Sequence, residues 1–441
     1  MSWYGCSKLS YSNSRTISVR KELRNMPQKI LTISIAAYNV ESYIGKTLDS
    51  LLCKKEWLDK LEIFVVDDES TDETAIIAQR YEKRYPQSIH VIHKKNGGHG
   101  STLNYSIRHA TGKYFRMLDG DDWYDTISLE KHLQKLTNED ADLVLTPYKR
   151  VTTKETTEVN RHYFKYGRKY ELAGKTYDLL ENLHAAEATI RTSLLQDNNV
   201  YLPENCSFSD DAFVSYMILY ANSVIKYETN VYRYRIGVEG QSISNIGRIR
   251  HKKDGFRVVE DVVRNISGFL KKQDIQKKQA IYNILCNTLE FQYDTLLLLD
   301  DLDDVKTIMK EETTKLYAYN NDFMKYFSNN SWLNFFLGEL LFKVPMLRLE
   351  ENAPIIIVGA GKYGELAVHI LMRQEIRPCY VCDNNRERQG TKLQDVEIVS
   401  VERAVKVKNA IFFIAVKSDG MILRKQLIDK NVMDCKIIYN S

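Results

Sequence analysis

One apolar, aromatic run of the sequence, KYFRML, is followed by four closely spaced aspartates: Asp119, Asp121, Asp122 and Asp125. Two like charges about 4 Å apart repel by roughly 4 kcal/mol at an effective dielectric constant near 20. A fold tolerates such crowding where water screens the charges or where a cation lies among them. The run therefore indicates either a solvated acidic turn or a site for a divalent cation, with Gly120 letting the backbone come close.

A second acidic pair, Asp67 and Asp68, ends the apolar run LEIFVV. Paired carboxylates at the end of a strand can accept hydrogen bonds from a nucleotide base or a ribose. The alternative is that one of them is simply solvated at a helix N-terminus. We expect that helix over residues 72–85, with Ser70 or Thr71 as its N-cap.

From residue 29 onward, β-branched apolar runs alternate with amphipathic stretches of helical length. The strands are expected in ILTISIAAY, LEIFVVDD, SIHVIHK and KYFRML. This alternation predicts a mostly parallel α/β sheet with helices on both faces. Ligands of such sheets bind beyond the carboxyl ends of the strands, so the two acidic groups are expected to converge in one cleft.

Four pieces of the sequence stand in the order of a known family: ISIAAYN, VVDDESTDET, NGGHGSTLNYSIRHATGKYF and LDGDDW. On these motifs, residues 29 to about 240 resemble a family 2 glycosyltransferase with the GT-A fold. The resemblance implies inverting transfer of a single sugar from a nucleotide-sugar, in the first place a UDP-sugar, to a glycan acceptor. It also implies a Mn²⁺ or Mg²⁺ cofactor and a role in polysaccharide biosynthesis at a bacterial cell envelope, with a free or lipid-linked glycan as acceptor.

The resemblance assigns roles to the acidic residues. Tyr38 and the pair Asp67 and Asp68 would contact the base of the nucleotide. Asp119 would approach the ribose, and Asp121 would ligate the metal, with Asp119 as the other candidate ligand. Asp122 and Asp125 are expected as caps of the helix that follows.

The resemblance also implies a general base for the acceptor hydroxyl, in an acidic pair that opens a helix. The matching stretch is FSDDAFVSYMIL, with Ser209 where the family has Glu. Asp210 is the candidate base and Asp211 the reserve, because the base must be a carboxylate within reach of the hydroxyl. Helix capping is the alternative for both. Arg233 or Arg235, in a segment that resembles the family's closing segment over the donor site, would meet a phosphate or the acceptor.

The chain departs from the family pattern in two places. Many members have Ala-Arg-Asn where this chain has Thr102, Leu103 and Asn104, so an arginine that often meets the base is missing. The Q-x-x-R-W signature of processive synthases and their apolar spans are also missing, which favours single-sugar addition over polymerisation. His93, His99 and His109 are assigned no role.

Near the C-terminus, Gly359, Gly361 and Gly364 have the G-x-G-x-x-G spacing after an expected strand, and Asp383 ends the next one. This context is typical of a Rossmann-like nucleotide-binding domain, with Asp383 at the ribose. Three functions are open for this domain: it could bind a second nucleotide, have a structural or oligomerising role, or carry out dehydrogenase chemistry. The alternative functions are a nucleotide-sugar-binding or modifying protein that acts through this domain, and a non-catalytic scaffold in glycan assembly.

The 441 residues allow several domains. We expect a leader over 1–28 with the biological start at Met26, a GT-A domain over 29–245, a helical region over 246–350, and the Rossmann-like domain over 351–441. The apolar stretch Ser331 to Arg348 would be either a helix at a membrane interface or a helix packed between two domains.

Bulk composition narrows the class of protein. A net charge of +4 is small for a chain of this length and does not indicate nucleic-acid binding. Seven scattered cysteines do not form a disulfide framework, which indicates a reducing compartment and a cytoplasmic protein. Peripheral contact with the inner face of the cell membrane and a homo-oligomeric state are left open.

Overall fold

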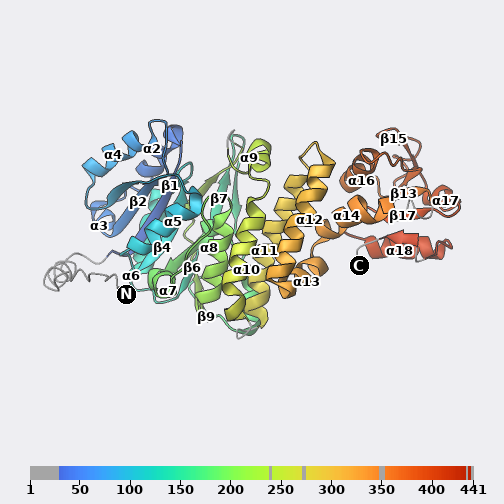
Figure 1. Ribbon diagram of the computed structural model, residues 1–441. Coiled ribbons are helices and arrows are strands. Elements are labelled where there is room, and N and C mark those ends of the chain that lie inside the picture. The colour runs from blue at the N-terminus through green and yellow to red at the C-terminus, as the bar shows by residue number, and fades with distance from the viewer. Residues whose placement is uncertain (1–28, 238–240, 271–274, 347–352, 434–435, 439–441) are drawn as a thin grey trace, which may run out of the picture. The chain divides into compact units, whose positions relative to one another are not determined.

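Figure 1 shows the computed structural model of the chain, which describes residues 29–237, 241–270, 275–346, 353–433 and 436–438. The expected leader and the start at Met26 lie outside the described residues. The chain divides into two compact units, Met1–Val238 with Ile275–Ala280, and Glu239–Asp274 with Ile281–Ser441.

Among the described residues, the first unit is built on an eight-stranded sheet in the order β3-β2-β1-β4-β10-β6-β11-β9. Strands β1 to β4 are parallel, and β10 is antiparallel to both of its neighbours. The strands are β1 (Leu31–Ala37), β2 (Leu61–Asp67), β3 (Ile89–His93), β4 (Tyr114–Asp119), β6 (Leu143–Leu145), β9 (Lys169–Glu171), β10 (Ala188–Arg191) and β11 (Ser223–Lys226). A smaller sheet has the order β5-β12-β7-β8, with β5 (Trp123–Tyr124), β7 (Tyr148–Val151), β8 (Thr156–Val159) and β12 (Tyr232–Arg235).

Helices cover both faces of the large sheet (Figure 1). Ile33 and Ile35 of β1 pack into a core with Leu48 and Leu129, whereas Ser34, on the opposite face, donates to Ser106 Oγ at 2.7 Å. The helices of this unit are α2 (Glu41–Asp49), α3 (Lys55–Leu58), α4 (Thr74–Arg84), α5 (Gly98–His109), α6 (Thr126–Thr137), α7 (Thr192–Asp197) and α8 (Ser209–Tyr220), with the 3₁₀ turns η1 (Gly174–Leu180) and η2 (Ala185–Glu187).

The expected N-cap of the second helix is wrong. Helix α4 begins at Thr74 and has no side-chain cap. Ser70 Oγ instead accepts the N–H of Asn39 at 3.0 Å, and Asp72 accepts the N–H groups of Thr74 and Glu41. The Ser70 hydroxyl therefore binds the loop after β1 and does not cap helix α4.

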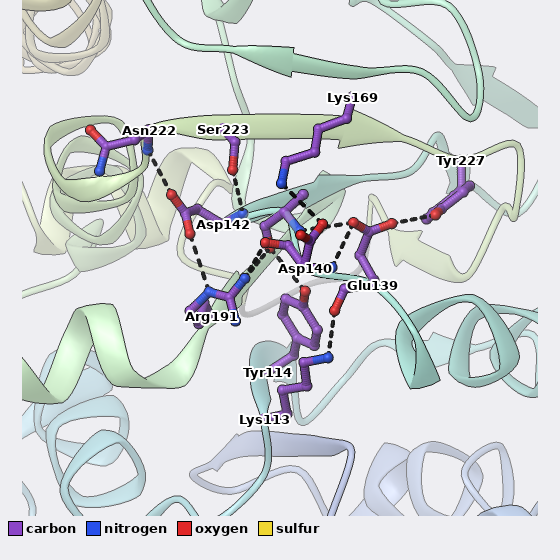
Figure 2. A network of polar contacts seen from close by, with 11 residues as sticks. Lys113, Tyr114, Glu139, Asp140, Asp142, Lys169, Arg191, Asn222, Ser223 and Tyr227 are labelled. Carbon is purple, nitrogen blue, oxygen red and sulfur yellow. Dashed lines mark hydrogen bonds and ion pairs between the residues drawn. The ribbon is translucent and has the colours of Figure 1, made fainter.

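A polar network ties the α6–β6 connection to the strands around it (Figure 2). The Asp142 carboxylate lies 3.1 Å from Arg191 Nε and accepts the N–H of Asn222 at 2.9 Å. Tyr114, the first residue of β4, donates its hydroxyl to the Ala141 carbonyl at 2.9 Å. These contacts lie at the amino-terminal end of β4, away from Asp119 at its carboxyl end.

The second unit combines helices with an α/β domain. Its described helices are α9 (Asn245–Arg250), α10 (Asp254–Leu270), α11 (Ile275–Leu296, shared with the first unit), α12 (Leu302–Tyr319), α13 (Asn321–Asn330), α14 (Trp332–Gly338), the π-helical turn η3 (Glu339–Lys343), α16 (Lys362–Met372), α17 (Val401–Ala404) and α18 (Gly420–Asp429). The sheet has the order β15-β16-β14-β13-β17-β18, with β13 (Ile355–Val358), β14 (Tyr380–Cys382), β15 (Lys392–Leu393), β16 (Val396–Val399), β17 (Ile411–Ile414) and β18 (Ile437–Ile438). Apart from the edge strand β15, the pairs are parallel, which gives the Rossmann order 3-2-1-4-5.

The apolar stretch Ser331 to Arg348 packs inside this unit as far as residue 346, and its last two residues lie outside the described part. Trp332 donates its indole N–H to the Val416 carbonyl at 3.0 Å, and the rings of Phe336 and Phe413 are 5.6 Å apart. Burial against the Rossmann-like domain therefore accounts for most of the apolar character of this segment. Within the described ranges, no helix is long and apolar enough to cross a bilayer.

Candidate active site

The carboxyl ends of the central strands lie level with one another. Ala37 of β1 pairs with Asp67 of β2, and Ala36 pairs with Asp119 of β4. Directly after β1 and β2, Asn39 and Glu69 have φ values of 50° and 68°, in the left-handed region that non-glycine residues seldom adopt. Both acidic groups therefore emerge at the same edge of the sheet, followed by sharp changes of chain direction.

The turn formed by residues 119–121 lies against β1. The N–H of Gly120 donates to the Ala36 carbonyl at 3.0 Å, and a Cβ at position 120 would lie 2.8 Å from that oxygen. Real Cβ atoms do not approach so closely, so only glycine allows this contact. This close approach fixes the turn on β1, with Asp119 just before Gly120 and Asp121 just after it.

Asp122 and Asp125 have structural partners. Asp122 is buried and accepts the Tyr232 hydroxyl at 2.7 Å and the N–H of Arg235 at 2.6 Å. Burial and the charges of Asp119 and Asp121 raise the pKa of Asp122 well above its ordinary value. Asp125 caps α6 through the N–H of Ser128, as expected, whereas Asp122 does not cap that helix.

The two arginines considered at the site lie in different places. Arg233 lies 3.1 Å from Asp125 in an ion pair. Arg235 donates through Nε to the backbone carbonyl of Asp121 at 2.7 Å, and its guanidinium lies 4.8 Å from the ring centre of Trp123. Of the two, Arg235 is the cation beside the 119–121 turn.

Asp67 and Asp68 are buried, and both contact the chain's own groups. Asp68 accepts the N–H groups of Gly97 and Gly98 at 3.0 and 2.7 Å and the Lys94 ammonium at 2.6 Å. Asp67 lies 3.1 Å from His93 Nδ1. Tyr38, in contrast, is 52% exposed at the end of β1. Asp68 therefore fixes the glycine loop at the start of α5, while the ring of Tyr38 is accessible.

The acidic pair Asp210 and Asp211 lies in the first turn of α8. The residue before the helix, Phe208, has a φ of 66°, and Ser209 is fully buried. No hydrogen bond or ion pair within the described residues holds the half-buried Asp210 carboxylate. A carboxylate in this state is free to accept a proton from a substrate.

His99, to which the sequence assigned no role, lies between Asp119 and the start of α8, the helix that carries Asp210. Its Nε2 is 3.3 Å from Asp119 Oδ1, an ion-pair contact rather than an aligned hydrogen bond, and its Nδ1 is 2.9 Å from Ser209 Oγ. Burial opposes the charged ring, but the nearby carboxylates of Asp119, Asp210 and Asp68 outweigh it and raise the pKa of His99. Nothing in the sequence pairs residues 99 and 209, so this contact appears only in the fold.

A group of rings lies near enough to Asp210 for its charge to act on His184 and Tyr234. His184 stacks on Tyr148 with ring centres 5.4 Å apart and lies 5.6 Å from Tyr234. His184 Nδ1 accepts the N–H of Ala186 at 3.2 Å, so the neutral ring carries its proton on Nε2. Burial lowers the pKa of His184 although the charge of Asp210 opposes the shift. The ring is therefore a hydrogen-bond donor rather than a second base.

Replacing Gly100 with alanine is expected to destabilise the first unit. A Cβ at Gly100 would lie 2.0 Å from the Pro203 carbonyl, so α5 would have to move away from the segment that leads into α8. We expect a loss of about 1–3 kcal/mol in urea unfolding. Gly45→Ala is the matched control, because that Cβ in α2 meets only Tyr81 Oη at 3.9 Å, and helix propensity should then raise stability by roughly 0.5–1 kcal/mol. Equal effects of the two substitutions would show that the close approach at Gly100 has no energetic weight.

The family model for glycosyl transferase family 2 matches residues 32–198. The first unit therefore contains a family 2 glycosyltransferase domain. This domain holds Asp68, Asp119 and Asp121, while Asp210 lies just beyond the matched residues.

Relatives of known name agree with this assignment. The minor teichoic acid biosynthesis protein GgaB of Bacillus subtilis is 24% identical over 322 residues, 68% of this chain and 35% of GgaB. The poly(ribitol-phosphate) beta-N-acetylglucosaminyltransferase TarS of Staphylococcus aureus is 27% identical over 215 residues, 48% of this chain and 37% of TarS. The chain thus spans about a third of the length of these two relatives.

A solved structure of S. aureus TarS residues 1–349 in complex with UDP-GlcNAc superposes with a TM-score of 0.54 at 20% identity, covering 79% of this chain and 92% of that one. At this identity the likeness concerns the fold. It confirms the GT-A fold that the order of motifs indicated for the family 2 domain.

The glycine motif of the second unit is built as a Rossmann turn. Gly359 has a φ of 102°, and a Cβ at Gly364 would lie 1.9 Å from the Gly359 carbonyl, so α16 packs closely on the turn. Asp383 accepts the N–H groups of Ala360 and Asn385 at 2.6 and 2.7 Å. Both carboxylate oxygens of Asp383 thus already bind the protein's own backbone.

Proposed function

We propose that the chain transfers a single sugar, with inversion, from a UDP-sugar to a glycan acceptor of the cell envelope. The observation that carries this proposal is the convergence of the 119–121 turn and Asp210, with His99 in contact with both Asp119 and the residue next to Asp210. A donor diphosphate and an acceptor hydroxyl need carboxylates of these two kinds close together.

The names of the relatives support the class of donor and acceptor. TarS is named as an N-acetylglucosaminyltransferase and was solved with UDP-GlcNAc, and GgaB is named for teichoic acid biosynthesis. We therefore place a UDP-sugar on this chain's donor side, with Tyr38 and the Asp67–Asp68 pair near the base. A cell-wall glycopolymer is the acceptor class that fits best.

The 119–121 turn suits a divalent cation. The described residues hold no group of three or more His, Cys, Asp and Glu side chains arranged around a metal. As the family resemblance implies, Mn²⁺ or Mg²⁺ would bind through Asp119 and Asp121, and oxygens of the diphosphate and water would complete its shell, as is usual for Mg²⁺. When bound, the ion supplies Lewis-acid stabilisation of the leaving diphosphate.

The chain's own residues would carry out the rest of the reaction. The acceptor oxygen attacks the anomeric carbon, the bond from that carbon to the diphosphate oxygen breaks, and the hydroxyl proton passes to Asp210. His184, with its proton on Nε2, presents a hydrogen-bond donor near Asp210, and Arg235 places a positive charge at the 119–121 turn. A single displacement of this kind inverts the anomeric centre.

The Rossmann-like domain carries the alternative. Its strand order and the turn at Gly359 and Gly361 favour binding of a second nucleotide, or of a nucleotide-sugar, there. Against a ribose contact at Asp383 stands the use of both its oxygens by backbone N–H groups. If the chain were a non-catalytic scaffold, neither the site in the first unit nor the Rossmann-like domain would bind a sugar donor.

The test is release of the nucleoside diphosphate from a panel of nucleotide-sugars by the full chain, with and without Mn²⁺ or Mg²⁺. We expect metal-dependent hydrolysis of one UDP-sugar, since water can replace the acceptor in a slow side reaction. Absence of hydrolysis across the panel, with and without metal, would contradict the proposed function.

A further inference from the structure

The start of helix α5 contacts three parts of the proposed site in the first unit: Asp68, Asp119 and the residue next to Asp210. Gly97, just before the helix, and Gly98, its first residue, donate to Asp68, and His99 reaches Asp119 on one side and Ser209 on the other. Ser209 is the residue next to Asp210. One imidazole ring therefore spans the gap between the turn assigned to the metal and the helix that carries the base.

Neighbouring contacts hold this helix firmly on the segment before α8. The N–H of Asn205 donates to the Gly97 carbonyl at 2.6 Å. Asn104 donates to the Leu202 carbonyl at 2.9 Å and accepts the N–H of Leu202 at 2.8 Å. Because Gly100 also lies close against Pro203, the backbone beneath His99 has little freedom to move.

The residue at position 209 suits this bridge. A serine hydroxyl offers His99 Nδ1 a short, uncharged partner at 2.9 Å, and it is fully buried. A glutamate at position 209 would add a further negative charge beside Asp210 and near Asp119. The combination of His99 with Ser209 thus links the two halves of the site without adding to the repulsion between their carboxylates.

We propose that His99 is a positioning residue, which sets the separation between Asp119 and Asp210 through its contacts with Asp119 and Ser209. The inference rests on the proposed function. It explains why one side chain contacts both elements, since a base that is displaced by about 1 Å can lose roughly 10²-fold in rate. His99 itself need not touch the reacting atoms.

Three substitutions at this position separate the two contacts. Asparagine places an amide N–H near the position of Nδ1 and can keep the contact with Ser209. Glutamine places one near Nε2 and can keep the contact with Asp119, whereas alanine keeps neither contact. For hydrolysis of the UDP-sugar identified by the panel, we expect His99→Ala to lower kcat by about 10²-fold with little change in KM. His99→Asn and His99→Gln should each restore part of this loss.

Two further measurements distinguish positioning from general damage to the fold. His109→Asn, at the other end of α5, is the matched control and should leave hydrolysis unchanged. Ser209→Ala should lower kcat in the wild type but add little to His99→Ala, because both remove the same contact. Binding of UDP with Mn²⁺ should stay close to that of the wild type in all of these variants.

The inference is overturned if wild-type hydrolysis persists undiminished in His99→Ala, if Asn and Gln are as poor as Ala, or if the effects of His99→Ala and Ser209→Ala simply add. In each of these cases the proposed function can still stand, because the wild type remains active. If the wild type hydrolyses no nucleotide-sugar, the proposed function fails and this inference fails with it.

Discussion

Asp210→Asn is expected to lower sugar transfer and donor hydrolysis by about 10²- to 10⁴-fold, the usual contribution of a general base. Asparagine keeps the size of the side chain but cannot take the proton of the attacking hydroxyl. Because the Asp210 carboxylate is not held by the described residues, its loss should not disturb the fold. The check is a comparison of kcat for UDP release with the affinity for UDP and Mn²⁺, which should stay unchanged.

Asp211→Asn is the matched control for this prediction. Asp211 follows in the same turn of α8, and its N–H donates to the Phe208 carbonyl, a contact that asparagine retains. We expect only a small effect on kcat. Loss of activity in Asp211→Asn together with retention in Asp210→Asn would move the base to the neighbouring carboxylate.

Asp121→Ala is expected to weaken the binding of UDP in the presence of Mn²⁺ by at least about tenfold, or ~1.4 kcal/mol. The substitution removes one of the two carboxylates proposed to hold the ion. It leaves the turn intact, because Gly120 remains and Arg235 can still donate to the backbone carbonyl of residue 121. Titration calorimetry with and without Mn²⁺ measures the effect.

Asp140→Asn is the control for a lost negative charge on the same unit. Asp140 is exposed and pairs with Lys169 at 3.0 Å in the network of Figure 2, at the other end of β4. Its substitution should leave UDP binding unchanged. If both variants weaken binding equally, the effect comes from the overall charge and not from a metal at the 119–121 turn.

The sheet and the grouping of acidic residues could be predicted because both follow from local patterns. Strands that alternate with helices pair in parallel, and parallel strands bring their carboxyl ends to one edge. The pairing of Ala37 with Asp67 and of Ala36 with Asp119 follows from that rule. The GT-A fold was predicted from the resemblance to family 2 glycosyltransferases, whose motifs stand in order along this chain.

The bridge through His99 could not be predicted, because its partner Ser209 is 110 residues away. No sequence pattern indicated that Asp68 would accept the N–H groups of Gly97 and Gly98, or that the Ser70 hydroxyl would accept the N–H of Asn39. Each of these contacts depends on where loops from separate strands meet. Such tertiary contacts decide which polar groups remain free for a substrate.

The central claim is that the nucleotide binds in the first unit with a metal, and calorimetry of UDP binding to the full chain tests it most directly. The measurement compares the wild type, Asp121→Ala and Asp383→Asn, each with and without Mn²⁺. The account predicts Mn²⁺-dependent binding that Asp121→Ala loses and Asp383→Asn keeps. Binding that needs no Mn²⁺, survives Asp121→Ala and is lost in Asp383→Asn would contradict it and place the nucleotide in the Rossmann-like domain.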